Sequence, residues 1–113
     1  MQQINWIKPD IKIQYSGQID ISTKTARRMK LDRHSMISFF LDKEDNLYVK
    51  RVNDGGLRPT SVHGSNHLRF HSAGTVKRIL SLPDIPKGVK NAGFRIGEPD
   101  DGNSFPVITR KML

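Results

Sequence analysis

A chain of 113 residues is long enough for one domain with a single modest core. It contains no cysteine, which excludes disulfides and thiolate metal sites and is typical of a reducing compartment, so we expect a cytoplasmic protein. No apolar run approaches the length of a membrane span. We also expect no secretory signal, because the first residues lack a basic stretch followed by an apolar one.

The chain is strongly basic, since 19 Lys and Arg against 11 Asp and Glu give a formal net charge of +8. Such a surplus attracts polyanions, which include nucleic acids, anionic membrane surfaces and acidic proteins. A helix lying on a membrane needs a long amphipathic segment, and the pattern predicts only two short helices, so we expect no membrane binding. Nucleic acid is the first interpretation, and a basic surface that serves solubility alone is the alternative.

In the first half of the chain, apolar and polar residues alternate with the period of half-buried strands, and a short apolar run over 36–41 is typical of a buried strand. Ser22 or Thr23 can cap a helix through its hydroxyl. Polar residues over 42–46 predict a turn between two further strands. The predicted elements are strands over 11–15 and 18–21, a helix over 24–31, and strands over 36–41 and 47–52.

The second half has a similar order of elements. A strand over 57–62 is weakened by Pro59, and Pro106 indicates an edge position for the last strand, because proline donates no hydrogen bond to a neighbour. Ser72 is a candidate helix cap, and Pro83 ends the helix. The other predicted elements are a strand around 68–70, a helix over 75–80, and strands around 94–96 and 105–108.

The two halves, about 10–52 and 57–111, therefore form a degenerate repeat of strand, strand, short helix, strand, strand. The helix regions match as Ser22-x-x-Thr25-x-Arg27-Arg28-Met29 and Ser72-x-x-Thr75-x-Lys77-Arg78-Ile79. One such unit exposes too much sheet edge to be stable alone. We therefore predict one β-rich domain over 1–113, in which two related halves interleave into a barrel with two short helices.

Part of the first half resembles a known family. The residues concerned are the strands over 11–22 with Gly17-Gln18-Ile19-Asp20-Ile21, the helix over 25–31, and the hairpin over 37–49. They resemble the AbrB/SpoVT-type and MazE-type DNA-binding domains. The resemblance implies a swapped-hairpin β-barrel that binds double-stranded DNA as a transcription regulator or antitoxin. Members of this family usually dimerise to complete the barrel. Here the second half can do so internally, as in MraZ-like doubled members, so we expect a monomer with an internal pseudo-dimer or a homodimer.

Basic residues cluster around the two predicted helices and on the strands beside them. Lys and Arg neutralise phosphates and release counterions, and Arg can also read guanine edges in the major groove. A solvated helix face is the alternative for such charge runs. The candidate nucleic-acid contacts are Lys12, Lys24, Arg27, Arg28, Lys30, Arg33, Arg69, Lys77 and Arg78.

Other polar and aromatic residues have simpler interpretations. His63, His67 and His71 are spaced by four, but Gly64-Ser65-Asn66 disfavours the helix that would align them, so we expect no metal site. The acidic groups at 42–45 and 100–103 are typical of turns rather than calcium loops. Trp6, Tyr48 and Phe70 are candidates for stacking on bases, although packing is the commoner use of such rings.

The chain has no P-loop, no serine-elbow motif and no cysteine nucleophile, so we expect no enzyme activity and no cofactor. The predicted function is double-stranded DNA binding, as a transcription regulator or antitoxin-like protein. Two alternatives remain open. One is binding of single-stranded DNA or RNA on an open sheet, and the other is a protein–protein module that binds an acidic partner without any nucleic acid.

Overall fold

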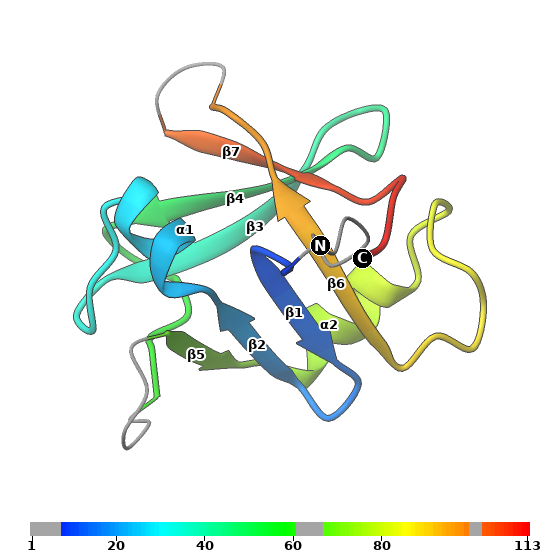
Figure 1. The fold of residues 1–113 in the computed structure, drawn as a ribbon, viewed down its shortest axis with the longest axis horizontal. Coiled ribbons are helices and arrows are strands. Elements are labelled where there is room, and N and C mark those ends of the chain that lie inside the picture. Colours follow the sequence, from blue (N-terminus) through cyan, green and yellow to red (C-terminus); the bar gives the residue numbers. More distant parts are fainter. Residues whose placement is uncertain (1–7, 61–66, 100–102) are drawn as a thin grey trace, which may run out of the picture.

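The computed structural model describes residues 8–60, 67–99 and 103–113. Over these residues the chain forms seven antiparallel strands and two short helices (Figure 1). In chain order they are β1 (Ile11–Gln14), β2 (Gln18–Ile21), α1 (Thr23–Arg28), β3 (Met36–Leu41), β4 (Leu47–Val52), β5 (Leu68–His71), α2 (Ala73–Leu80), β6 (Asn91–Ile96) and β7 (Ser104–Ile108). The predicted β-rich fold is confirmed.

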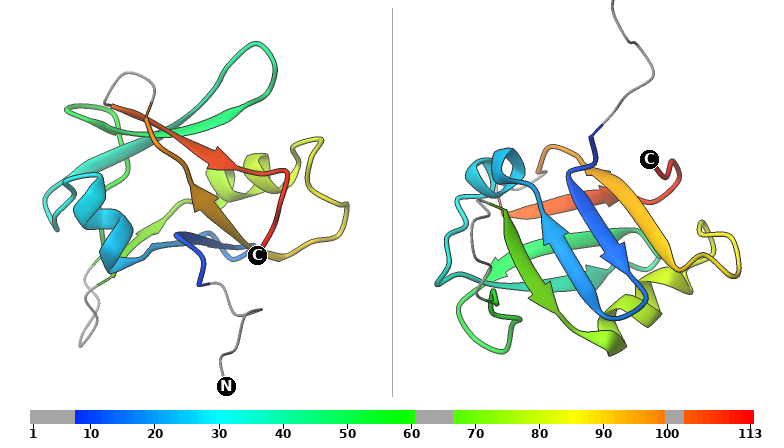
Figure 2. Two further views of the ribbon diagram at one scale, coloured as in Figure 1. Left: turned by 45° about the horizontal axis from the view of Figure 1, so that its top comes forward. Right: turned by 60° about the horizontal axis from the view of Figure 1, so that its bottom comes forward.

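The strands follow the order β3-β4-β7-β6-β1-β2-β5 across the sheet. The hairpin β6–β7 from the second half lies between the two hairpins of the first half, because β7 pairs with β4 and β6 pairs with β1. The sheet curls, so that β1 and β2 face β3 and β4 across the core (Figure 2). One continuous sheet therefore needs strands from both halves of the chain.

The segment 57–60 runs between the two edge strands of the sheet. Leu57 forms an isolated bridge with Ile37 of β3, and Thr60 forms one with Arg69 of β5. The strand predicted over 57–62 is wrong in its described part. Pro59 has no N–H to donate, so the segment makes two separate bridges instead of a ladder. Residues 61 and 62 lie outside the described residues.

Each strand buries one face, as the alternation predicted. Ile11 and Ile13 of β1 and Ile19 and Ile21 of β2 are 0% exposed, and each buried isoleucine contributes about 2 kcal/mol of hydrophobic stabilisation. The tight turn between these strands needs Gly17, which has a φ of 111°. From α2 the same core receives Val76, Ile79 and Leu80.

The two helices begin with the same capping geometry. Ser22 Oγ accepts a hydrogen bond from Thr25 N, and Ser72 Oγ accepts one from Thr75 N, both at 3.2 Å. In each case the serine hydroxyl donates to Oγ1 of that threonine at 2.8 Å. Both predicted caps are confirmed, and their equivalence supports the predicted repeat.

The helix ends differ from the predicted ones. The first helix was predicted to reach residue 31, but α1 ends at Arg28 because Lys30 has a left-handed φ of 59°. The second helix begins at Ala73, directly after its cap, and ends at Leu80, before Pro83 can interrupt it. Neither α1 nor α2, the helices of the described ranges, is long and apolar enough to cross a membrane.

The edge position predicted from Pro106 is wrong. Strand β7 lies inside the sheet, paired with β4 on one side and β6 on the other. The Pro106 carbonyl accepts a hydrogen bond from Gly97 N at 2.8 Å, so the nitrogen of Pro106 also faces β6. Pro106 thus lies opposite Gly97, which is one residue beyond the end of β6 at Ile96. The hydrogen bond that the Pro106 nitrogen cannot donate is therefore not needed by the β6–β7 ladder.

Candidate nucleic-acid interface

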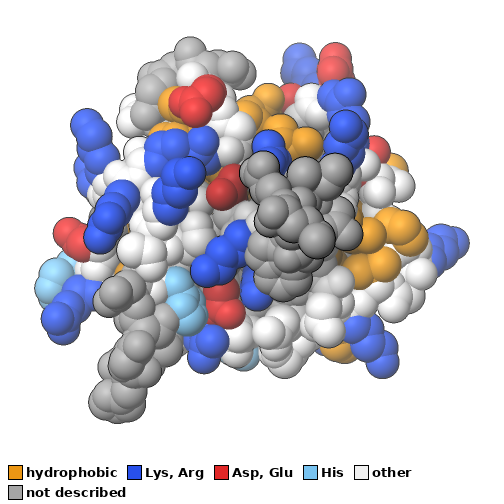
Figure 3. Space-filling view, in the orientation of Figure 1, with side chains coloured by type: hydrophobic (Ala, Val, Ile, Leu, Met, Phe, Trp, Pro, Cys, Tyr) orange, Lys and Arg blue, Asp and Glu red, His pale blue; other side chains and the backbone are white. Residues whose placement is uncertain are grey.

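An open groove of about 1030 Å³ lies over β1 and β2, beside α1 and the end of β6, and we call it the α1 groove. On this face Lys and Arg side chains surround acidic ones (Figure 3). Asp10 and Asp20 are its two carboxylates. Its basic residues are Lys8, Lys12, Lys24, Arg28, His67 and Arg95.

Strand alternation directs two of these cations outward. Lys12 and Arg95 are exposed, and both sequence neighbours of each are buried apolar residues. Lys12 stands opposite Gly93 in the β1–β6 pairing, so Arg95 is its diagonal neighbour on the next strand. Diagonal neighbours of this kind lie about 7 Å apart, which places both charges within reach of one short stretch of phosphate backbone.

Asp10 joins α1 to the sheet at one end of the groove. Its Oδ1 accepts from the Thr25 hydroxyl at 3.0 Å and its Oδ2 accepts from Ile96 N at 2.8 Å. Its backbone N–H donates to the Phe94 carbonyl at 3.0 Å. Thr25 is only 1% exposed, so both oxygens of this carboxylate are engaged in bonds that hold α1 on the sheet.

Asp20 is also engaged within the fold. Arg69 donates to it through Nε at 2.7 Å and through a terminal nitrogen at 3.4 Å, and Gln18 Nε2 donates at 2.9 Å. These bonds to Asp20 raise the pKa of the Arg69 guanidinium above its ordinary value. His67 Nε2 lies 3.6 Å from the same carboxylate. Arg69 is therefore paired with Asp20 inside the fold, and its predicted role as a nucleic-acid contact stays a prediction.

Arg28 lies on the groove wall with a fixed side chain. It pairs with Glu98 at 3.2 Å, donates to the Ile96 carbonyl, and lies 5.9 Å from the centre of the Phe105 ring. Glu98 is largely exposed, so this ion pair stays accessible to solvent and is screened by salt.

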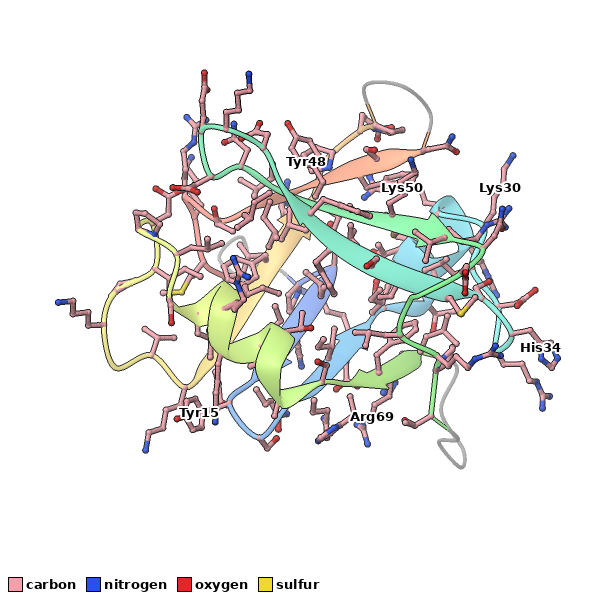
Figure 4. All side chains as sticks on the ribbon, turned by 180° about the vertical axis from the view of Figure 1, so that it is seen from behind. Tyr15, Lys30, His34, Tyr48, Lys50 and Arg69 are labelled. Atoms are coloured by element: carbon pink, nitrogen blue, oxygen red, sulfur yellow. The ribbon has the colours of Figure 1, made fainter. Side chains whose placement is uncertain are left out.

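The structure distributes the nine predicted basic residues over several surfaces. Lys12, Lys24 and Arg28 line the α1 groove. Arg27, Lys30 and Arg33 are exposed but lie outside its lining. Lys30 and Arg69 project from different sides of the molecule (Figure 4). The remaining two belong to α2, where Lys77 lies 5.7 Å from the centre of the Tyr15 ring and Arg78 lines a different groove.

Two cations of the groove, Lys8 and Arg95, were absent from the predicted set. The outward direction of Arg95 was readable from the alternation around it. Its proximity to Lys12 was not, because it depends on the pairing of β6 with β1 across most of the chain length. Lys8 precedes the first strand, where no periodic pattern indicates its direction.

The stacking role considered for Phe70 is wrong, because this ring is 0% exposed and belongs to the core. Tyr48 is half-buried, and its hydroxyl lies 3.4 Å from Asp42. Trp6 lies outside the described residues. Among the described residues no aromatic side chain lines the α1 groove, so these residues offer cations but no stacking platform.

The turn interpretation of the first acidic group is confirmed. Asp42 Oδ1 accepts from the backbone N–H groups of Glu44 and Asn46 at 2.9 and 3.0 Å, and the Asn46 side chain donates to Oδ2 at 3.0 Å. These bonds, led by that of the Asn46 side chain, lower the pKa of Asp42. Residues 100–102 and His63 lie outside the described residues, which contain no cluster of three or more potential metal ligands.

No protein-family model, curated protein or solved structure matches the chain. The resemblance to the AbrB/SpoVT and MazE types stays a prediction.

Proposed function

We propose that this protein binds double-stranded DNA through the α1 groove, mainly by contacts to the phosphate backbone. The observation that supports this proposal is the gathering of Lys8, Lys12, Lys24, Arg28 and Arg95 around one open groove. The two carboxylates among them already accept internal hydrogen bonds. The five Lys and Arg side chains outnumber the two carboxylates, so the net charge of the groove is positive, and phosphates that enter it would release their counterions.

The lining of the groove favours a duplex over a single strand. Single-strand binding uses aromatic rings on which bases stack, and the described residues of this lining include none. The exposed Tyr15 and Phe40 lie outside it. Lys24 and Arg27, exposed on α1, are our candidates for contacts to base edges in the major groove. The biological role we propose is transcription regulation, which the family resemblance also implies.

The experiment is fluorescence anisotropy with a labelled random duplex and a labelled single strand, at about 50 and about 200 mM salt. If four phosphates are neutralised, duplex affinity falls by about a hundredfold between these concentrations. The double variant Lys12→Gln, Arg95→Gln should reduce the slope of log affinity against log salt by about two.

Lys43→Gln, Lys87→Gln is the matched control, because it removes the same charge from exposed sites outside the groove. Equal loss of affinity in both double variants would indicate attraction by net charge alone and would contradict the proposed site. Preference for the single strand would support the alternative nucleic-acid function, and absence of binding to either probe would exclude both.

A further inference from the structure

A second groove, of about 510 Å³, lies between α2 and the edge strand β3, and we call it the α2 groove. Its lining is mostly apolar, with Phe40 and Leu41 exposed by 46% and 39%. Thr75 and Arg78 of α2 are among its polar residues. An exposed apolar surface beside an unpaired strand edge is suited to a protein segment rather than to a phosphate backbone.

The register of the sheet relates this groove to the α1 groove. Ile37 and Leu57 exchange both of their backbone hydrogen bonds, at 3.0 and 2.7 Å, and they correspond to the paired residues Phe94 and Ile11. Phe39, two residues after Ile37, therefore corresponds to Ile96, two residues after Phe94. Gly56, which precedes Leu57, corresponds to Asp10, which precedes Ile11. The matching helices add Thr75 for Thr25 and Arg78 for Arg28, so the two grooves have corresponding positions throughout.

The corresponding acids are missing from the α2 groove. Asp10 accepts hydrogen bonds from Thr25 and Ile96 in the α1 groove, but its counterpart Gly56 has no side chain. A Cβ at Gly56 would lie 2.5 Å from Val52 Cγ2, so no side chain from this position can replace the carboxylate. Glu98, which pairs with Arg28, corresponds to Leu41. Leu41 lies five residues after Met36, and Glu98 lies five residues after Gly93, which is the counterpart of Met36.

Three hydrogen-bond donors are consequently left without an acid within the described part of the chain. Thr75 Oγ1 accepts from Ser72 as Thr25 Oγ1 does from Ser22, but the hydroxyl proton of Thr75 has no counterpart of Asp10. The N–H of Phe39 points away from β4, on the same side as that of Ile37, because alternate residues of an antiparallel strand face the same way. Arg78 makes no ion pair with any described residue.

We propose that the α2 groove binds an extended segment of a partner protein, in which one carboxylate is flanked by apolar side chains. The carboxylate takes the position that Asp10 has in the α1 groove and accepts from the Thr75 hydroxyl and the Phe39 N–H. Arg78 lies three residues after Thr75 on the same helix face, and it attracts this carboxylate by its charge. The backbone of the segment pairs with the free edge of β3, and its apolar side chains pack on Phe40 and Leu41. This proposal does not depend on DNA binding.

The first test is selection from a phage-displayed random heptapeptide library on the full-length protein, with counter-selection on the double variant Thr75→Val, Arg78→Gln. We expect enrichment of peptides that contain one Asp or Glu between Leu, Ile, Val or Phe residues. No enrichment, or enrichment of peptides without a carboxylate, would overturn the proposal.

The second test titrates the most enriched peptide, and the same peptide with its acid replaced by the amide, into ¹⁵N-labelled protein. The acidic peptide should bind at least about tenfold more tightly than the amide and should shift the Phe39 amide signal. Thr75→Val and Arg78→Gln should each weaken binding by about tenfold.

Lys77→Gln is the matched control for Arg78→Gln, because it removes one charge from the same helix turn and lies outside the α2 groove. Affinity should be unchanged in this variant. Equal weakening by Lys77→Gln, equal affinity for the two peptides, or shifts confined to the α1 groove would each contradict the proposed site. The duplex affinity of the Thr75→Val variant, measured in parallel, separates this proposal from DNA binding.

Discussion

The α1 and α2 grooves share one backbone arrangement but differ in their charges. Each lies beside a helix that begins with a serine cap and a threonine three residues later, and each is bounded by a strand of the curled sheet. The α1 groove contains Asp10, which joins the helix to the sheet. The α2 groove has Gly56 at the corresponding position, so no side chain joins its helix to the sheet there. Two acids, Asp10 and Glu98, therefore satisfy donors in the α1 groove whose counterparts in the α2 groove have no acid among the described residues.

The largest effect is expected from Asp10→Ala, which removes the carboxylate that holds α1 on the sheet. The Thr25 hydroxyl and the Ile96 N–H both lose their acceptor, in a region where Thr25 is 1% exposed. We expect the free energy of unfolding to fall by about 3 kcal/mol, measured by urea denaturation. A loss below about 0.5 kcal/mol would show that the two grooves do not differ in the way described.

A comparison of the two threonines sharpens this prediction. Thr25→Val should cost about 2 kcal/mol, because Asp10 loses a buried donor. Thr75→Val should cost less than about 1 kcal/mol, because Thr75 is half-exposed and its hydroxyl donates to no described acceptor. Equal losses in the two variants, again from urea denaturation, would contradict the assignment of different roles to the two hydroxyls.

Leu41→Glu should convert the α2 groove toward the charge pattern of the α1 groove. It gives Arg78 the acidic neighbour that Arg28 has in Glu98. Binding of an acidic peptide should weaken by about tenfold, while stability should change by less than about 1 kcal/mol because the new pair is exposed. Calorimetric titration measures the first quantity. Leu41→Gln is the control, because it makes the same position polar without a charge and should retain more of the binding.

The smallest effect concerns the turn between β3 and β4, the hairpin that borders the α2 groove. Hydrogen bonds, the largest from the Asn46 side chain, lower the pKa of Asp42 below its ordinary value of 3.8. A depressed folded-state pKa contributes stability above 3.8 that is lost as the pH falls through the folded value. The urea midpoint should therefore decline less steeply below this pH in Asp42→Asn than in the wild type. Identical pH profiles would exclude this contribution.

Local sequence patterns predicted much of the fold. An apolar run and an alternation located β3 and β4 with their observed bounds, and the serine caps located the start of both helices to within two residues. These features depend on neighbours within a few residues, so they are legible without knowledge of the rest of the chain. The edge position predicted from Pro106 was wrong. The donor that Pro106 lacks matters only where a partner strand continues, and the sequence does not reveal where β6 ends.

The candidate site was less predictable than the fold. Lys12, Lys24 and Arg28 were predicted as contacts and do line one groove, whereas Arg69 was predicted as a contact and is paired with Asp20. The exposure of a charge can be read from alternation, but its partners come from strands that are distant in the sequence. The same reason explains why the proximity of Arg95 to Lys12 could not be foreseen.

The sequence by itself determined the net charge of +8, the β-rich character and the two capped helices, because composition and short-range periodicity decide these properties. Only the tertiary structure decided which charges remain available. The insertion of β6 and β7 between the hairpins of the first half brings Ile96 to Asp10 and Glu98 to Arg28. At the corresponding place in the α2 groove, β3 contacts Gly56 and Leu57 instead. Electrostatic and hydrogen-bond satisfaction depends on distance in space, and that distance follows from strand order rather than from position along the chain.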